Sequence, residues 1–146
     1  MRKMMLVLSA VFALTVAAVA EPQWLTDLPK AQALAKESKK KVLVNFTGSD
    51  WCGFCIKLHK DVFDTKEFAD YAEKNLVLVE IDFPTKKAQS DELKKANKKL
   101  QDQFKVKGFP TVVILDSNGK KLGEEVGFGG GEPKDCLAKL DKISGK

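Results

Sequence analysis

The chain has 146 residues, of which 44% are hydrophobic, and its formal net charge is +5. This length suits one compact domain with a hydrophobic core and excludes separate cofactor and substrate domains. A mean hydropathy of -0.22 excludes a protein with many membrane spans. Three cysteines are too few for a small scaffold held by disulfides, and the odd number leaves at least one thiol without a partner in the chain.

The N-terminal segment has the pattern of a secretory signal peptide. The basic pair Arg2-Lys3 precedes an uncharged, largely apolar run over 4–20, which ends in Ala18-Val19-Ala20. A basic start, a short apolar run and small residues at its end are typical of a cleaved signal peptide. A retained membrane anchor is the weaker alternative, because a spanning helix needs roughly 20 apolar residues.

Cleavage after Ala20 divides the chain into a signal peptide at 1–20 and a single domain at 21–146. Loss of the two basic residues lowers the formal charge from +5 to +3, so the mature domain is only mildly basic. We therefore expect a periplasmic or secreted monomer with no stable membrane anchor after cleavage. In such a compartment cysteine pairs can be oxidised.

The remaining sequence predicts helices that alternate with strands. In chain order the expected elements are a helix from Asp27-Leu28-Pro29, a strand at 41–46, helical segments from Ile56 onward, a strand at 76–81, a helix at 86–105, a strand at 111–115, a further strand ending near Val126, and a last helix from Glu132-Pro133. Helical crossovers between the first two strands favour parallel pairing, and the Asn118-Gly119 turn favours an antiparallel hairpin. The order predicts an α/β fold with a mixed sheet.

Cys52-Gly53-Phe54-Cys55 lies where the first predicted strand gives way to a helix. Two intervening residues on the first turn of a helix bring the sulfurs close enough to form a small ring that opens and closes without unfolding. The helix N-terminus stabilises a thiolate at Cys52, and the thiolate is the attacking species in disulfide exchange. Cys55, one turn deeper, would then attack the mixed disulfide and release the substrate. Gly53 leaves the approach to the sulfur open, and Phe54 offers an apolar contact surface beside it.

Zinc and haem sites can use a similar cysteine spacing. A structural zinc site would need two further ligands, and only His59 and Cys136 are available, with no second ligand pair. Covalent haem attachment is disfavoured because Ile56, and not a histidine, follows Cys55. We expect no metal and no organic cofactor, since electrons can travel on the cysteine pair itself.

Two motifs together resemble the thioredoxin family, in particular its secreted or periplasmic thiol–disulfide oxidoreductases. They are Trp51-Cys52-Gly53-Phe54-Cys55 after a buried strand and Gly108-Phe109-Pro110-Thr111 before the third strand. The resemblance extends over residues 24–144 and implies a thioredoxin fold, with a central mixed sheet flanked by helices. It also implies a cis peptide at Phe109–Pro110 that faces the cysteines and helps to hold substrate backbone, with Trp51 and Pro110 shaping the groove.

The resemblance further implies thiol–disulfide exchange on cysteine-containing protein substrates, as a reductase or isomerase in preference to an oxidase, with a redox partner protein. The alternative is a binding module or chaperone of the same fold without catalysis, and both cysteines argue against it. Nucleic-acid binding is disfavoured, because Asp91, Glu92 and Asp102 alternate with the lysines of the predicted 86–105 helix.

Three features depart from the family pattern. Asn45 lies nearest the position of a buried Asp that helps to move protons for the second cysteine, and because Asn cannot ionise, Glu80 or a water is the candidate replacement. The segment between Asp82 and Pro110 is longer, which implies a lengthened helix before the cis-Pro loop. Phe109 is bulkier than the usual residue at its position, which bears on substrate preference.

Two further side chains have both a structural and a chemical interpretation. His59 lies one helical turn after Cys55, and a partly buried residue without chemistry is favoured over a chemical role. Cys136 shares a helix face with Leu140 and Ile143, which favours a buried, inert thiol over a regulatory or intermolecular one.

Overall fold

The computed structural model describes residues 21–145, so the predicted signal peptide at 1–20 lies outside the described residues. Helices and strands alternate along the chain, as the sequence predicts. Their bounds are β1 Trp24–Leu25, α1 Leu28–Ser38, β2 Lys41–Thr47, α2 Gly53–Leu58, the π-helical η1 His59–Phe63, α3 Lys66–Asn75, β3 Leu76–Asp82, α4 Asp91–Gln103, β4 Thr111–Leu115, β5 Lys121–Val126 and α5 Pro133–Ser144.

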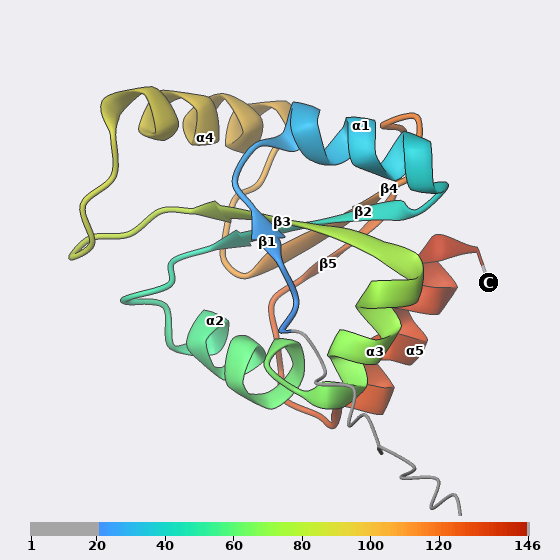
Figure 1. Cartoon of the computed structure of the whole chain (residues 1–146). Helices are drawn as coiled ribbons and strands as arrows, with labels where there is room; N and C mark the ends of the chain where they lie inside the picture. Colours follow the sequence, from blue (N-terminus) through green and yellow to red (C-terminus); the bar gives the residue numbers. More distant parts are fainter. Residues whose placement is uncertain (1–20, 146) are drawn as a thin grey trace, which may run out of the picture.

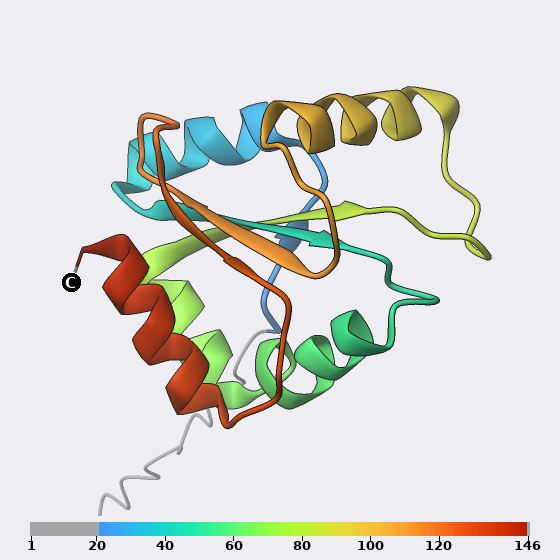
Figure 2. The same ribbon diagram turned by 180° about the vertical axis from the view of Figure 1, so that it is seen from behind.

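The strands form one mixed sheet in the order β1-β3-β2-β4-β5. β3 runs parallel to both β1 and β2, whereas β4 runs antiparallel to β2 and β5. Helices α1 and α4 cover one face of the sheet, and α2, α3 and α5 cover the other (Figures 1 and 2). This is the expected α/β architecture, a central mixed sheet flanked by helices.

Alternation along β2 decides which side chains reach the face that α2 covers. Val42, Val44 and Phe46 pack into the core beneath α1, while Leu43 belongs to the core beneath α2 and α3. Because successive side chains of a strand point to opposite faces, Asn45 lies on the same face as Leu43. Asn45 is fully buried, so the fold places a polar side chain inside the layer next to α2.

The structure corrects the predicted helix at 86–105, since α4 begins only at Asp91. The Ser90 hydroxyl caps this helix by accepting the Leu93 N–H at 3.2 Å, which leaves residues 86–90 in the preceding loop. The added length before the cis-Pro loop is therefore shared between a loop and a helix. The buried residue of α4 is Asn97. Its amide donates to the Asp82 carbonyl at 2.9 Å, which ties the helix to the end of β3.

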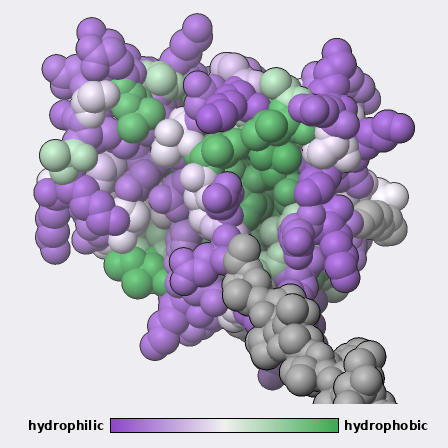
Figure 3. Space-filling view, in the orientation of Figure 1, coloured by the Kyte–Doolittle hydropathy of each residue, from purple (hydrophilic) through white to green (hydrophobic). Residues whose placement is uncertain are grey.

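The sequence prediction also missed β1, which pairs with β3 through two residues. A two-residue strand is too short to show alternation. β1 covers little of the sheet edge, and apolar side chains lie at the surface beside it (Figure 3). Leu25, Leu34 and Val77 help to line an open pocket there. Within residues 21–145, no helix has the length and apolar character needed to cross a membrane.

Candidate active site

Cys52 and Cys55 are joined by a disulfide at the N-terminus of α2, with their Cα atoms 5.2 Å apart. Cys52 is the residue that caps the helix, and its Sγ accepts the Cys55 N–H at 3.3 Å. The exposed fraction is 7% for Cys52 and 1% for Cys55. Cys52 is therefore the more accessible residue of the pair.

Hydrogen bonds fix the loop between β2 and α2 to the segment that follows β3. The Trp51 indole N–H donates to the Phe83 carbonyl at 2.7 Å, and the Ser49 N–H donates to the Asp82 carboxylate at 2.9 Å. The Trp51 ring also covers Gly48 so closely that a Cβ at that position would overlap the indole atoms. Trp51 is thus held in one place directly before Cys52.

Aromatic rings extend from Trp51 to the cis-proline loop. Phe109 makes an edge contact with Trp51 at 6.0 Å between ring centroids and stacks on Phe83 at 5.1 Å. The Phe109–Pro110 peptide is cis, as expected, and the Pro110 carbonyl accepts the Gly127 N–H at 2.8 Å. The structure thus brings Trp51 and Phe109 together, and it adds Phe83, which the sequence did not single out because it follows a strand without a recognisable motif.

The surface around the disulfide is apolar. The exposed fractions are 48% for Trp51, 63% for Phe54 and 48% for Ile56. A Cβ on Gly53 would meet no atom within 4 Å, so the first turn of α2 is open to an approaching molecule. Exposed apolar side chains that cluster in this way are typical of an interaction site.

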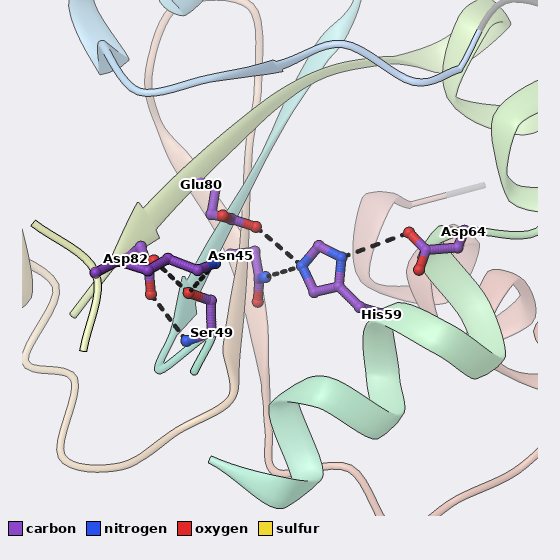
Figure 4. Close-up of polar contacts among 7 residues, drawn as sticks. Asn45, Ser49, His59, Asp64, Glu80 and Asp82 are labelled. Carbon is purple, nitrogen blue, oxygen red and sulfur yellow. Dashed lines mark hydrogen bonds and ion pairs between the residues drawn. The ribbon is translucent and has the colours of Figure 1, made fainter. Parts of the chain in front are cut away.

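A polar cluster lies under the same helix (Figure 4). His59 Nε2 is 2.9 Å from Glu80 Oε2 and 3.4 Å from Asn45 Nδ2, and His59 Nδ1 is 3.7 Å from Asp64 Oδ1. Asn45 and Glu80 are direct neighbours in the β2–β3 register, so they reach His59 from adjacent strands. The side chain of His59 is partly buried, as predicted, but its contact with Glu80 could be suspected only from the charge that interrupts the apolar run of β3.

Opposing effects act on the pKa of His59. Burial alone would lower the pKa of His59, but the hydrogen bond and negative charge of Glu80, with a smaller contribution from Asp64, outweigh it and raise the pKa above its ordinary value. A carboxylate that faces a half-buried imidazole stabilises the protonated form of the ring.

The third cysteine, Cys136, is half-buried in α5 and packs against the core beneath α2 and α3. Burial raises the pKa of the Cys136 thiol, with Lys139 opposing the shift. Because the thiolate is the reactive species, the raised pKa lowers the reactive fraction of this thiol, although the side chain is less buried than the sequence predicts.

Comparisons with known proteins agree with this geometry. A family model described as "Thioredoxin-like domain" matches residues 28–144. The disulfide bond reductase DsbH of Chlamydia pneumoniae is 40% identical over 126 residues, which cover 86% of this chain and 73% of that protein. The thioredoxin-related protein DsbJ of the same organism is 29% identical over 106 residues, 73% of this chain but only 30% of the relative.

A solved structure titled "DsbH Oxidoreductase" superposes with a TM-score of 0.78 and 34% sequence identity, and the alignment covers 92% of this chain and 93% of that one. The similarity therefore extends over nearly the whole length of both chains. From these comparisons and the redox-active pair, the chain belongs to the thioredoxin-like family and is a thiol–disulfide oxidoreductase.

Proposed function

We propose that this protein reduces disulfide bonds in cysteine-containing protein substrates outside the cytoplasm, with rearrangement of such bonds as a related activity of the same pair. The observation that carries the proposal is the disulfide at the start of α2, in which Cys52 is more accessible than Cys55. The name "disulfide bond reductase" of a relative with 40% identity supports reduction over oxidation.

The reduced protein would act in two steps. The Cys52 thiolate attacks one sulfur of the substrate disulfide, forms a mixed disulfide and releases the other substrate sulfur as a thiolate. Cys55 then loses its proton and attacks Cys52 Sγ, which regenerates the Cys52–Cys55 disulfide and releases the second substrate sulfur. Two electrons pass from the cysteine pair to the substrate, so each cycle needs a redox partner protein that reduces the pair again.

The groove for the substrate would be formed by the side chains of Trp51, Phe54 and Phe109, with Gly53 and Pro110 close to its floor. The apolar surface beside Cys52 supports this assignment, since Trp51 and Phe54 are both about half exposed or more. An extended polypeptide offers apolar side chains to such a surface, and its backbone can pair with the segment at the cis-proline.

The location rests on the signal peptide predicted at residues 1–20. N-terminal sequencing of the protein recovered from its native host, together with fractionation of the cells, tests this part of the proposal. A mature N-terminus at Glu21 in the extracytoplasmic fraction is the expected result. Recovery of the full-length chain from the cytoplasm would contradict it.

The direction of electron flow is tested by equilibrating the Cys52–Cys55 pair with redox buffers and measuring its reduction potential. A reductase is expected near the thioredoxin value of about -270 mV, and a value near -120 mV would identify an oxidant. The Cys52→Ser variant should lose all exchange activity, and Cys55→Ser should accumulate reductant-sensitive mixed disulfides. A pair that never cycles between dithiol and disulfide would indicate a binding module without catalysis.

A further inference from the structure

The second step of the proposed cycle requires a proton acceptor near Cys55. Only 1% of this residue is exposed, so its thiol cannot give the proton directly to bulk water. Asn45, the polar side chain of β2 that contacts His59, is fully buried and has no ionisable group. An ionisable side chain from another element near Cys55 would therefore assist this step.

An open pocket among the described residues reaches Cys55, and Glu80 of the sheet also lines it. Cys55, His59 and Glu80 line it, and its other walls are Ser49, Ile56, Lys60, Asp64 and Lys87. Its volume of about 300 Å³ is enough for several water molecules. The titratable groups that face this space are therefore His59 and Asp64 from the helical segment, Glu80 from β3, and the two lysines at the rim.

The helical segment that carries Cys55 also places His59 at the edge of this pocket. His59 follows Cys55 by four residues, and its backbone N–H donates to the Cys55 carbonyl, so both side chains lie on one helix face. At His59 the helix changes to π-type hydrogen bonding, a feature found frequently at functional sites. The rings of Trp24 and Phe63, at centroid distances of 5.5 and 5.2 Å, hold the imidazole in place.

The hydrogen-bond partners of His59 suit a ring that gains and loses a proton. When Nε2 carries a proton it donates to the Glu80 carboxylate at 2.9 Å. When Nε2 carries none it can accept from the Asn45 amide at 3.4 Å. Asn45 Oδ1 is buried without a protein partner among the described residues. Because buried polar atoms are normally hydrogen-bonded, a water molecule in the cluster would donate to this oxygen.

We propose that the His59–Glu80 pair accepts the Cys55 proton, through water in this pocket, when Cys55 attacks the mixed disulfide. The proton leaves Cys55 Sγ and reaches the neutral imidazole, where the Glu80 carboxylate stabilises the resulting positive charge. The Cys55 thiolate attacks Cys52 Sγ, and the released substrate thiolate takes its proton from solvent. The imidazolium returns its proton to solvent before the next cycle. The inference rests on the proposed function, because it assigns the base for its second step.

The experiment isolates that step. A mixed disulfide between Cys52 and glutathione is prepared in the full mature chain, and release of glutathione is followed in a single turnover between about pH 5 and pH 10. His59→Gln removes the base, and Glu80→Gln removes its stabilising charge with almost no change of shape. Asp61→Asn is the matched control, since it removes a different ion pair, with Lys57, from the same helical segment.

In the wild-type protein the release rate should fall as the pH drops through the raised pKa of His59, because only the neutral ring accepts a proton. His59→Gln should remove this inflection and slow release at pH 7 by roughly tenfold or more. The variant should approach the wild-type rate near about pH 10, where the thiol ionises by itself. Glu80→Gln should move the inflection to lower pH, and Asp61→Asn should leave the profile unchanged.

A profile of His59→Gln that superimposes on the wild type, or that is lowered equally at every pH, would overturn the proposal, because a purely structural role changes the rate without changing its pH dependence. If His59→Gln does not fold, the position of the inflection in Glu80→Gln decides the matter. A wild-type mixed disulfide that never releases glutathione would contradict the proposed function itself. Release with an unshifted profile in the folded variants contradicts only the role of His59 and Glu80.

Discussion

The carboxylate of Asp50 accepts the backbone N–H of Thr85 at 2.9 Å and so joins the loop before Cys52 to the loop after β3. Its second oxygen accepts the N–H groups of Lys86 and Lys87 at 2.7 and 2.9 Å. The Thr85 backbone bond is the main reason that the pKa of Asp50 falls to about 2. Burial opposes this shift, and the amides of Lys87 and Lys86 and the Thr85 hydroxyl add to it. One side chain thus orders two loops that border the disulfide.

Replacing Asp50 with alanine should free the three amides and loosen the segment 83–90. Hydrogen exchange followed by NMR should show faster exchange at Thr85, Lys86 and Lys87, while amides of β2 and β3 keep their protection. Asp91→Asn is a suitable control, since among residues 21–145 Asp91 pairs only with Lys94 at the start of α4. Unchanged exchange at all three amides would contradict the assigned role of Asp50.

The same contact has a defined pH dependence. Because the pKa of Asp50 is lower in the folded protein than the ordinary Asp value of about 3.9, its contribution is present above about pH 4 and is lost as the pH falls through about 2. Protection of the Thr85 amide should therefore persist at pH 4 and disappear towards pH 2. Loss of protection already near pH 5 would show that another group holds the loop.

Trp24 links the edge strand β1 to the core beneath α2 and α3. Its ring lies 5.1 Å from Phe63 and 6.3 Å from Phe68 between centroids, and it also contacts His59. Trp24→Ala should lower the free energy of unfolding by about 2–3 kcal/mol, since a large ring leaves a packed cluster. Val126→Ala, at a side chain that is 65% exposed, should change it by less than about 0.5 kcal/mol. Denaturant unfolding of both variants measures the difference.

The framework of the sheet could be predicted because its strands leave strong local signals. Continuous apolar runs identify β2, β3 and β4, and the turn at Asn118-Gly119 identifies the hairpin to β5. The start of α4 could not be placed as well, since the lysine-rich segment is polar enough to be either loop or helix and the Ser90 cap decides between them. A strand as short as β1 depends on its partner and carries no pattern of its own.

The candidate site also contains residues that the sequence could predict and residues that it could not. The cysteine pair and the cis-proline belong to compact motifs, so their positions could be read from the sequence. The contact of His59 with Glu80 joins positions from different elements, and only the β2–β3 register brings Glu80 beside Asn45. Long-range side-chain pairs of this kind have no local signature, and the same is true of Asp50 and its three amides.

Asn45→Asp tests how a second carboxylate in the buried cluster of Asn45, His59 and Glu80 changes the stability of the protein. The new group would be fully buried next to Glu80, so desolvation and repulsion should outweigh the attraction of His59 and raise its pKa above the unfolded value of about 3.9. A raised carboxyl pKa means that the folded state loses stability as the pH rises above about 4. We expect a loss of about 2 kcal/mol at pH 8 and a smaller loss at pH 5. Gln103→Glu, which adds a carboxylate at the surface, is the control, and an equal loss at both pH values would contradict this interpretation.

Phe54 should determine how well a folded polypeptide engages the site without affecting the chemistry of the sulfurs. Its ring is 63% exposed beside Cys52, so it can bury apolar area against a protein substrate but has little to contact on a small disulfide reagent. Phe54→Ser should lower kcat/KM for reduction of a disulfide-bonded protein by about tenfold, which corresponds to about 1.4 kcal/mol of lost contact. Reduction of a small aliphatic disulfide should change by less than about twofold. Leu122→Ser, at an exposed position on β5, should leave both rates unchanged. An equal loss on both substrates would show instead that Phe54 acts on the cysteine pair, because only an effect on the sulfurs themselves would be independent of substrate size.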